Sequence, residues 1–187
     1  MSRNFLRYIF ELVKVVAVSL AIIIPVRYYL IQPFYVKGAS MEPNFYDKEY
    51  LIVDEISFRL KNPERGDIIV FKYPRNPEEY FIKRIIGLPG EKVQIKNGFV
   101  YIYNEKNPEG LKLEESYLPE NDKTYGLNEE SVTLNSNEYY VLGDNRNFSK
   151  DSRSFGAVDG ELIIGRVLLR GWPFSRVHIF SAPNYSY

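Results

Sequence analysis

The pattern of apolar and polar residues divides the chain into an N-terminal stretch and a longer body. Charges interrupt the N-terminal apolar run only at Arg7, Glu11 and Lys14, whose spacing of four and three places them on one helical stripe. After Gln32-Pro33 the pattern changes to short apolar runs separated by turn residues. We therefore expect a helix over Phe5–Val26 and a mainly β domain over residues 32–187.

The short runs predict strands, and no helical pattern lies between them. Two of them flank Asn97-Gly98, which predicts a hairpin because this pair accepts positive φ. The expected strands are Phe34–Lys37, Tyr50–Val53, Asp67–Tyr73, Tyr80–Ile86, Lys92–Ile95, Phe99–Tyr103, Glu138–Leu142 and Leu162–Leu169.

One segment of the body departs from the strand pattern. Asn104–Glu130 holds eight acidic residues against three lysines and few aliphatic residues. We expect it to leave the sheet as a less regular excursion, either a solvated surface loop or a flexible lobe.

The N-terminal helix is long enough to cross a bilayer. Its 22 residues would extend about 33 Å, against a hydrocarbon core of roughly 30 Å. We expect a membrane anchor over residues 1–31, with Tyr28 and Tyr29 at the interface. One alternative is an amphipathic helix that lies on the membrane surface. The other is a cleaved leader, although the small-x-small site that its cleavage needs does not follow the apolar run in this sequence.

The basic residues give a mild preference for one orientation of that anchor. Arg3, Arg7 and Lys14 precede the apolar run, whereas Arg27 and Lys37 follow it within twenty residues. Three against two favours an N-terminus inside the cell and a body outside, on the extracytoplasmic side of the cytoplasmic membrane.

Composition excludes several classes of function. Lys+Arg and Asp+Glu both number 24, so no net field favours nucleic acid. Cysteine is absent, which excludes disulfides and thiolate metal sites. The chain has a single histidine, His178, which argues against a structural zinc site. A Ser-His-Asp triad would need a carboxylate to orient this histidine, and a packed or surface histidine is the favoured interpretation.

A serine and a lysine are the strongest candidates for chemistry. Ser40 follows an expected strand at Gly38-Ala39, where a turn would expose its hydroxyl. Strand alternation places Lys83 on one face with Phe81 and Ile85. Burial among apolar neighbours lowers the pKa of a lysine, so Lys83 could accept the serine proton near neutral pH.

Two other features bear on that pair. Lys37 lies three residues before Ser40 and is the second candidate base. The polar loop Gly143–Arg153 follows an expected strand and offers the Ser149 hydroxyl to a neighbouring amine. Arg146, Asp151 and Arg153 could form an ion network that stiffens this loop.

Four motifs in order resemble those of bacterial type I signal peptidases, in particular the Gram-positive branch. They follow the N-terminal apolar helix and together span most of the chain, leaving out Asn104–Glu130. The motifs are Ser40-Met41-Glu42-Pro43, Arg65–Phe71, Tyr80–Glu91 and Gly143–Arg153.

The resemblance implies a mainly β fold of the type shared by signal peptidases and self-cleaving repressors, behind a transmembrane helix. It implies a serine endopeptidase with Ser40 as nucleophile and Lys83 as general base, acting through an acyl-enzyme without metal or cofactor. Ser149 would hold the lysine amine, and Asp151 would support the site beside Arg146.

The same resemblance implies the substrate, which is a secretory preprotein whose signal peptide ends in small-x-small. Phe34, Val36 and Ile82 would line shallow pockets for the two small side chains. The Ser40 backbone N–H would stabilise the oxyanion. Some family members add a serine hydroxyl two residues earlier, where this chain has Gly38, so a Gly38 backbone contact is expected instead.

Two other functions are alternatives to a signal-peptide-cleaving endopeptidase. A self-cleaving repressor would share the fold and dyad but would carry a DNA-binding domain in place of the apolar N-terminus. A catalytically inactive, membrane-tethered β-domain could serve in binding or assembly. The oligomeric state is left open by the sequence.

Overall fold

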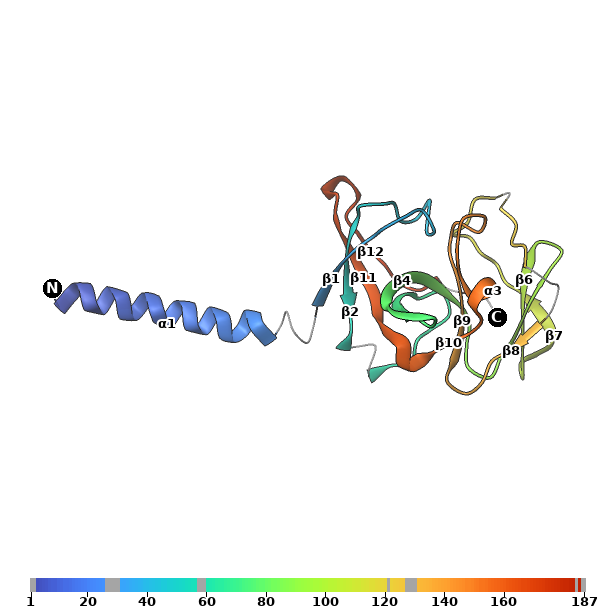
Figure 1. Ribbon diagram of the computed structural model, residues 1–187, viewed down its shortest axis with the longest axis horizontal. Helices are drawn as coiled ribbons and strands as arrows, with labels where there is room; N and C mark the ends of the chain where they lie inside the picture. Colours follow the sequence, from blue (N-terminus) through green and yellow to red (C-terminus); the bar gives the residue numbers. More distant parts are fainter. Residues whose placement is uncertain are drawn as a thin grey trace.

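The computed structural model describes residues 3–25, 31–56, 60–120, 122–126, 131–183 and 185. The chain begins with helix α1 (Arg3–Pro25), which projects away from a β-rich body (Figure 1). The helix expected over Phe5–Val26 is thereby found. Val26 and the interfacial pair Tyr28 and Tyr29 lie outside the described residues.

The charges in the first half of α1 limit its apolar character. Among the residues that the structure describes, no helix is both long and apolar enough to cross a membrane. The transmembrane span stays a prediction.

The larger sheet of the described chain is antiparallel, in the order β1-β2-β11-β3-β4-β9-β10, with β12 paired to β11. Its strands are β1 (Ile31–Tyr35), β2 (Tyr50–Asp54), β3 (Ile68–Tyr73), β4 (Asn76–Gly87), β9 (Glu138–Leu142), β10 (Val158–Asp159), β11 (Ile163–Trp172) and β12 (His178–Ile179).

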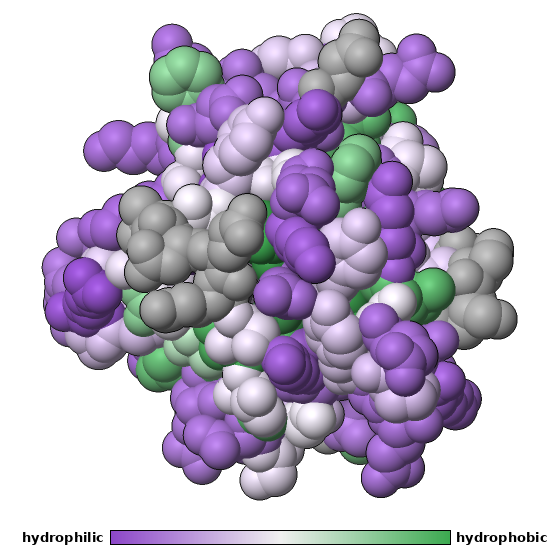
Figure 2. Space-filling view, turned by 90° about the vertical axis from the view of Figure 1, so that its right-hand side faces the viewer, coloured by the Kyte–Doolittle hydropathy of each residue, from purple (hydrophilic) through white to green (hydrophobic). Residues whose placement is uncertain are grey.

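The smaller antiparallel sheet has the order β7-β6-β5-β8 and lies at the end of the body remote from α1 (Figure 1). Its strands are β5 (Lys92–Lys96), β6 (Phe99–Asn104), β7 (Asn107–Lys112) and β8 (Ser131–Thr133). The face of the molecule at this end is mainly hydrophilic (Figure 2). Ile86 and Leu142 of the larger sheet pack in one buried cluster with Val93 and Val100 of the smaller sheet, which joins the two.

Short helical turns complete the described fold: α3 (Ser152–Phe155), η2 (Gly160–Leu162) and η3 (Phe174–Arg176). All eight expected strands occur, so the mainly β prediction is confirmed. β1 ends at Tyr35, before the expected Lys37, yet its pairing continues where the Val36 N–H donates to the Glu49 carbonyl.

The segment 104–130 is more regular than expected. β7 lies within it and pairs with β6, so part of the excursion belongs to the smaller sheet. Its sequence contains Pro108 and Gly110, both unfavourable in strands, which is why no strand was expected there.

The larger sheet curls so that β1 approaches β4, with the rings of Phe34 and Tyr80 5.7 Å apart. Within the described ranges β1 pairs only with β2. β4 pairs with β3 up to Arg84, but its other edge meets β9 only from Arg84 onward. Two strand edges that pair with no other described strand therefore flank the space between β1 and the first half of β4.

Candidate active site

Ser40 lies in the turn that follows β1. The residues around it anchor the turn, because Met41 and Phe45 are fully buried and the Phe45 N–H donates to the Met41 carbonyl. From the other side, the Asn145 N–H donates to the Ser40 carbonyl at 3.1 Å. The Ser40 side chain remains partly exposed at the surface of this anchored turn.

Lys83 projects from β4 into the body and is only 3% exposed. Its Nζ lies 5.3 Å from the centre of the Phe81 ring, and Ile85 next along the same face is fully buried. Burial lowers the pKa of Lys83 to about 8, against the opposing influence of the Asp151 and Asp144 carboxylates. A substantial fraction of this amine is therefore neutral at mildly alkaline pH.

The hydroxyl and the amine are in direct contact. Lys83 Nζ lies 2.8 Å from Ser40 Oγ and 2.8 Å from the Ile82 carbonyl oxygen. These distances are those of hydrogen bonds. A neutral amine at this position can accept the serine proton, which is the arrangement that activates a hydroxyl as a nucleophile.

A groove of about 780 Å³ opens in front of this pair. One wall is β1 with the turn to Ser40, and the other is β4 from Glu79 to Lys83. The three residues expected to form substrate pockets, Phe34, Val36 and Ile82, all line it and pack in one apolar cluster. The site is thus a largely apolar groove whose lining includes the serine and the lysine.

The loop after β9 closes the back of the site. Gly143 has no room for a side chain, since a Cβ there would overlap both Ser149 Oγ and the Ser40 carbonyl. The Gly143 N–H donates to Asp151 at 3.0 Å, and Asp151 also pairs with Arg153 at 2.8 Å. Asp151 therefore fixes the loop that packs against Ser40.

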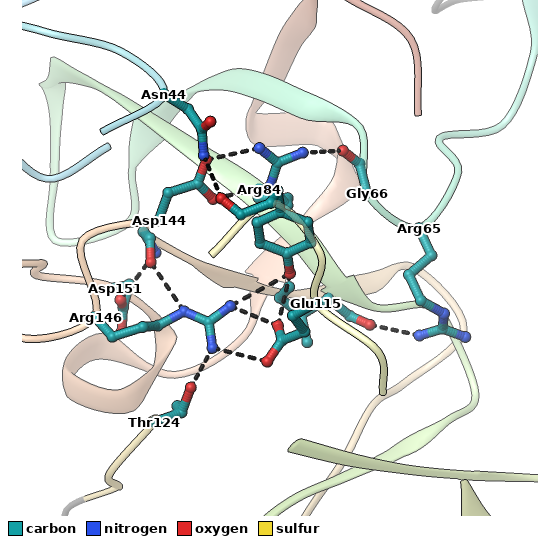
Figure 3. A network of polar contacts seen from close by, with 12 residues as sticks. Asn44, Arg65, Gly66, Arg84, Glu115, Thr124, Asp144, Arg146 and Asp151 are labelled. Carbon is teal, nitrogen blue, oxygen red and sulfur yellow. Dashed lines mark hydrogen bonds and ion pairs between the residues drawn. The ribbon is translucent and has the colours of Figure 1, made fainter. Parts of the chain in front are cut away.

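A buried ion pair lies beneath the loop. Arg84 donates through two nitrogens to Asp144, at 2.8 and 2.6 Å, and through a third to the Gly66 carbonyl (Figure 3). Asn44 donates to Asp144 at 2.8 Å. The Tyr117 ring stacks on the Arg84 guanidinium with 3.9 Å between them. This pair ties β4 to the loop after β9 and to the turn after Ser40.

Arg146 has different partners from those expected. It pairs with Glu115 at 2.5 Å and donates to Thr124, both in the acidic segment, and to the Gly143 carbonyl at 3.1 Å (Figure 3). Of the expected Arg146–Asp151–Arg153 network, the contact with Arg153 is present, whereas Arg146 is neutralised by Glu115. The acidic segment thus supplies buried partners rather than only a solvated surface.

Two supporting residues lack the contacts expected of them. Ser149 Oγ is buried but has no hydrogen-bond partner among the described residues, so its bond to Lys83 is not seen. The Gly38 N–H donates to Asp47 at 2.8 Å, which engages the group expected to serve an oxyanion. Gly38 has φ of +90°, a conformation that favours glycine.

The alternative bases are poorly placed. Lys37 lines the groove but is exposed, whereas Lys83 is buried and in contact with the serine hydroxyl. His178 is exposed on β12. Within the described residues, no cluster of three or more histidine, aspartate or glutamate side chains could hold a metal ion.

Sequence reasoning missed residues that act across long separations. Glu115 meets Arg146 from 31 positions away, and Asn145 meets Ala39 from 106. No local pattern signals such contacts. The one indication in the sequence that this loop makes such contacts was that Asp144 and Asn145 are polar and belong to the motif Gly143–Arg153.

Comparison with known proteins agrees with this geometry. A family model described as "Signal peptidase, peptidase S26" matches residues 9–172. The chain belongs to this family. It has signal peptidase I activity, that of a serine endopeptidase that cleaves signal peptides, and the function predicted from the sequence is confirmed at this level.

Individual relatives show how far the similarity extends. "Probable signal peptidase I-2" of Synechocystis sp. is 37% identical over 177 residues, covering 91% of this chain and 77% of the relative. "Signal peptidase IB" of Staphylococcus aureus is 35% identical over 194 residues, covering 98% of each. A crystal structure of a signal peptidase I from Enterococcus faecalis is 36% identical and covers 57% of this chain and 97% of that chain, with a TM-score of 0.47.

Proposed function

We propose that the chain cleaves signal peptides through a dyad of Ser40 and Lys83. The observation that carries this proposal is the 2.8 Å contact between Ser40 Oγ and the buried Nζ of Lys83. A serine hydroxyl is a weak nucleophile until a nearby base takes its proton. Lys83 is buried enough to be that base, whereas Lys37 is not.

The reaction proceeds in two halves. Ser40 Oγ attacks the scissile carbonyl carbon while its proton passes to Lys83 Nζ. The tetrahedral intermediate then collapses to an acyl-enzyme, and Lys83 returns the proton to the leaving amine. In the second half Lys83 takes a proton from water while the water oxygen attacks the ester carbonyl carbon. The second tetrahedral intermediate then collapses, the bond to Ser40 Oγ breaks, and Lys83 returns the proton to that oxygen, which restores both residues.

The oxyanion is stabilised by the Ser40 backbone N–H. No acceptor for this N–H is seen in the part of the chain that the structure describes. Such a preorganised donor is aimed at charge that develops only in the transition state. The N–H of Gly38 serves less well, because Asp47 already occupies it.

The substrate binds as an extended strand between β1 and β4. The two strand edges that pair with no other described strand supply backbone donors and acceptors, and side-chain pockets then give specificity. Phe34, Val36 and Ile82 line the groove in one apolar cluster. We infer that they form shallow pockets suited to small side chains, as a small-x-small motif requires. Secretory preproteins that carry this motif are the substrates we infer.

Ser149, Asp151 and Arg146 support the dyad from behind. Asp151 and Arg146 both contact the backbone of Gly143, which packs against Ser40. The Ser149 hydroxyl, which is buried and has no hydrogen-bond partner among the residues that the structure describes, lies beside the same glycine. We infer that Ser149 supports the lysine amine during the reaction, when the bond from Lys83 to Ser40 changes.

We also propose that the enzyme acts at the outer face of the cytoplasmic membrane, with α1 as a single-pass anchor and its N-terminus inside. Membrane anchoring is typical of the family. Strands β1, β2 and β11 lie at the α1 end of the body (Figure 1), and they carry exposed large apolar side chains. Among them are Tyr35, Tyr50 and Trp172. Contact with lipid would cover these residues.

The dependence of cleavage on pH tests the dyad directly. Because Lys83 must be neutral to accept the proton and its pKa is about 8, kcat/KM should rise through a midpoint near pH 8 and level off above it. The measurement is cleavage of a small-x-small precursor by detergent-solubilised enzyme, with the cut site read by mass spectrometry. A profile that is flat or falling between neutral and alkaline pH would contradict a lysine base.

Removal of residues 1–27 tests the anchor. We expect the shortened enzyme to keep its activity on a soluble peptide. On a precursor held in vesicles its cleavage rate should fall by about 100-fold, because the shared membrane no longer concentrates enzyme and precursor together. Rates on the two substrates are compared for both enzymes. Complete inactivity on the soluble peptide would show instead that the helix is part of the site.

A further inference from the structure

Asn145 joins the loop after β9 to both peptide groups that flank the Ser40 Cα. Its side-chain Nδ2 donates to the Ala39 carbonyl at 3.0 Å, and its backbone N–H donates to the Ser40 carbonyl at 3.1 Å. The Ala39 carbonyl also accepts the Glu42 N–H at 3.2 Å, which closes the local turn. Asn145 is the long-range member of this set.

The first of these bonds determines where the Ser40 N–H points. The Ala39 C=O and the Ser40 N–H belong to one planar trans peptide group, in which they point in opposite directions. Holding the carbonyl toward Asn145 therefore directs the N–H away from it. That N–H is the group without an acceptor among the described residues.

We infer that Asn145 is a positioning residue that aims the Ser40 N–H at the developing oxyanion. The inference rests on the proposed Ser40 chemistry and adds a residue that acts on the transition state without contacting substrate. An oxyanion donor contributes only when it is aligned before the reaction, and a small misalignment costs much of its effect. Asn145 is uncharged, so it exerts this effect without changing the charge around Lys83.

The test compares Asn145→Ala and Asn145→Leu with a matched control, Asn147→Ala. Asn147 lies two positions away in the same loop and is exposed, and its side chain has no hydrogen bond in the described structure. Leucine preserves the approximate shape of asparagine but cannot donate. We expect both Asn145 variants to lose about 10- to 100-fold in kcat, with KM within about twofold of wild type, while Asn147→Ala is unchanged.

Two further measurements distinguish alignment from general support. The affinity of a peptide boronic acid, whose tetrahedral adduct carries an oxygen at the oxyanion position, should fall by the same factor as kcat. The midpoint of the pH profile should not move. Binding of the uncleaved peptide, measured in a Ser40→Ala background, should be unaffected by Asn145→Ala.

Different results would contradict the positioning role of Asn145 and the proposed dyad of Ser40 and Lys83. Equal kcat in the Asn145 variants and Asn147→Ala, restored activity with leucine, a rise in KM alone, or unfolding of both Asn145 variants would overturn the role of Asn145. Cleavage by Ser40→Ala, or no inhibition of wild type by the boronic acid, would instead overturn the proposed dyad.

Discussion

Lys83→Arg should be as inactive as Ser40→Ala, with kcat reduced by at least about 10⁴-fold in both. Arginine retains the positive charge and much of the length of lysine, but its guanidinium does not deprotonate in proteins. A substrate-binding lysine would tolerate this change, whereas a general base would not. Initial rates on a small-x-small precursor, with mass spectrometry to confirm the cut site, measure the loss.

Arg84, which forms the buried ion pair with Asp144, is next to Lys83 on β4. A second arginine at position 83 could disturb that pair, so the folding of the variant is measured together with its rates. Lys72→Arg is the matched control, since Lys72 lies on the adjoining β3 and does not line the groove. It should keep full activity. An arginine variant at position 83 that retained half of the wild-type rate while folded would show that Lys83 positions the substrate instead of moving a proton.

Asp144→Ala should lower the free energy of unfolding by about 3–5 kcal/mol, because it leaves the buried Arg84 guanidinium without its counter-charge. The side chains of the pair are 5% and 0% exposed, so water cannot replace the lost partner. Urea denaturation measures the loss. Glu114→Ala, which removes an exposed carboxylate, serves as the control and should change stability by less than about 0.5 kcal/mol.

Asp144→Ala should also shift the pH profile of kcat/KM to more acidic pH. The Asp144 carboxylate raises the pKa of Lys83 and partly offsets the effect of burial. Removing it therefore lowers that pKa, and the midpoint of kcat/KM shifts to more acidic pH in whatever fraction remains folded. An unchanged stability, or a midpoint that moved to higher pH, would contradict the arrangement of Arg84 and Asp144 described above.

The strands were predictable because their chemistry is local. Alternation along Tyr80–Ile86 placed Lys83 on an apolar face, and in the structure Lys83 and Ile85 on that face are buried. The turn at Gly38-Ala39 likewise indicated an accessible Ser40. Burial and turn geometry depend on neighbours in the sequence, so they can be inferred without the tertiary structure.

The supporting contacts were not predictable in the same way. Arg146 had carboxylates close by in its own loop, and sequence proximity favoured Asp151, yet Glu115 from the acidic segment is its partner. Which carboxylate an arginine meets depends on how two sheets pack, and charge composition holds no information about that packing. For the same reason, the sequence predicts only a solvated surface loop or a flexible lobe for the segment 104–130, without the buried contact between Glu115 and Arg146.

The edges of β1 and β4 beside the groove, which pair with no other strand of the described structure, have a consequence for how the enzyme selects its targets. A polypeptide can insert there only if its own backbone donors and acceptors are unsatisfied over several consecutive residues. On the proposed binding of substrate as an added strand, a small-x-small sequence inside a helix or a folded hairpin would not bind, whatever its side chains. The conformation of the target would then be selected before its sequence, and a mature domain that folds promptly would be protected from accidental cutting.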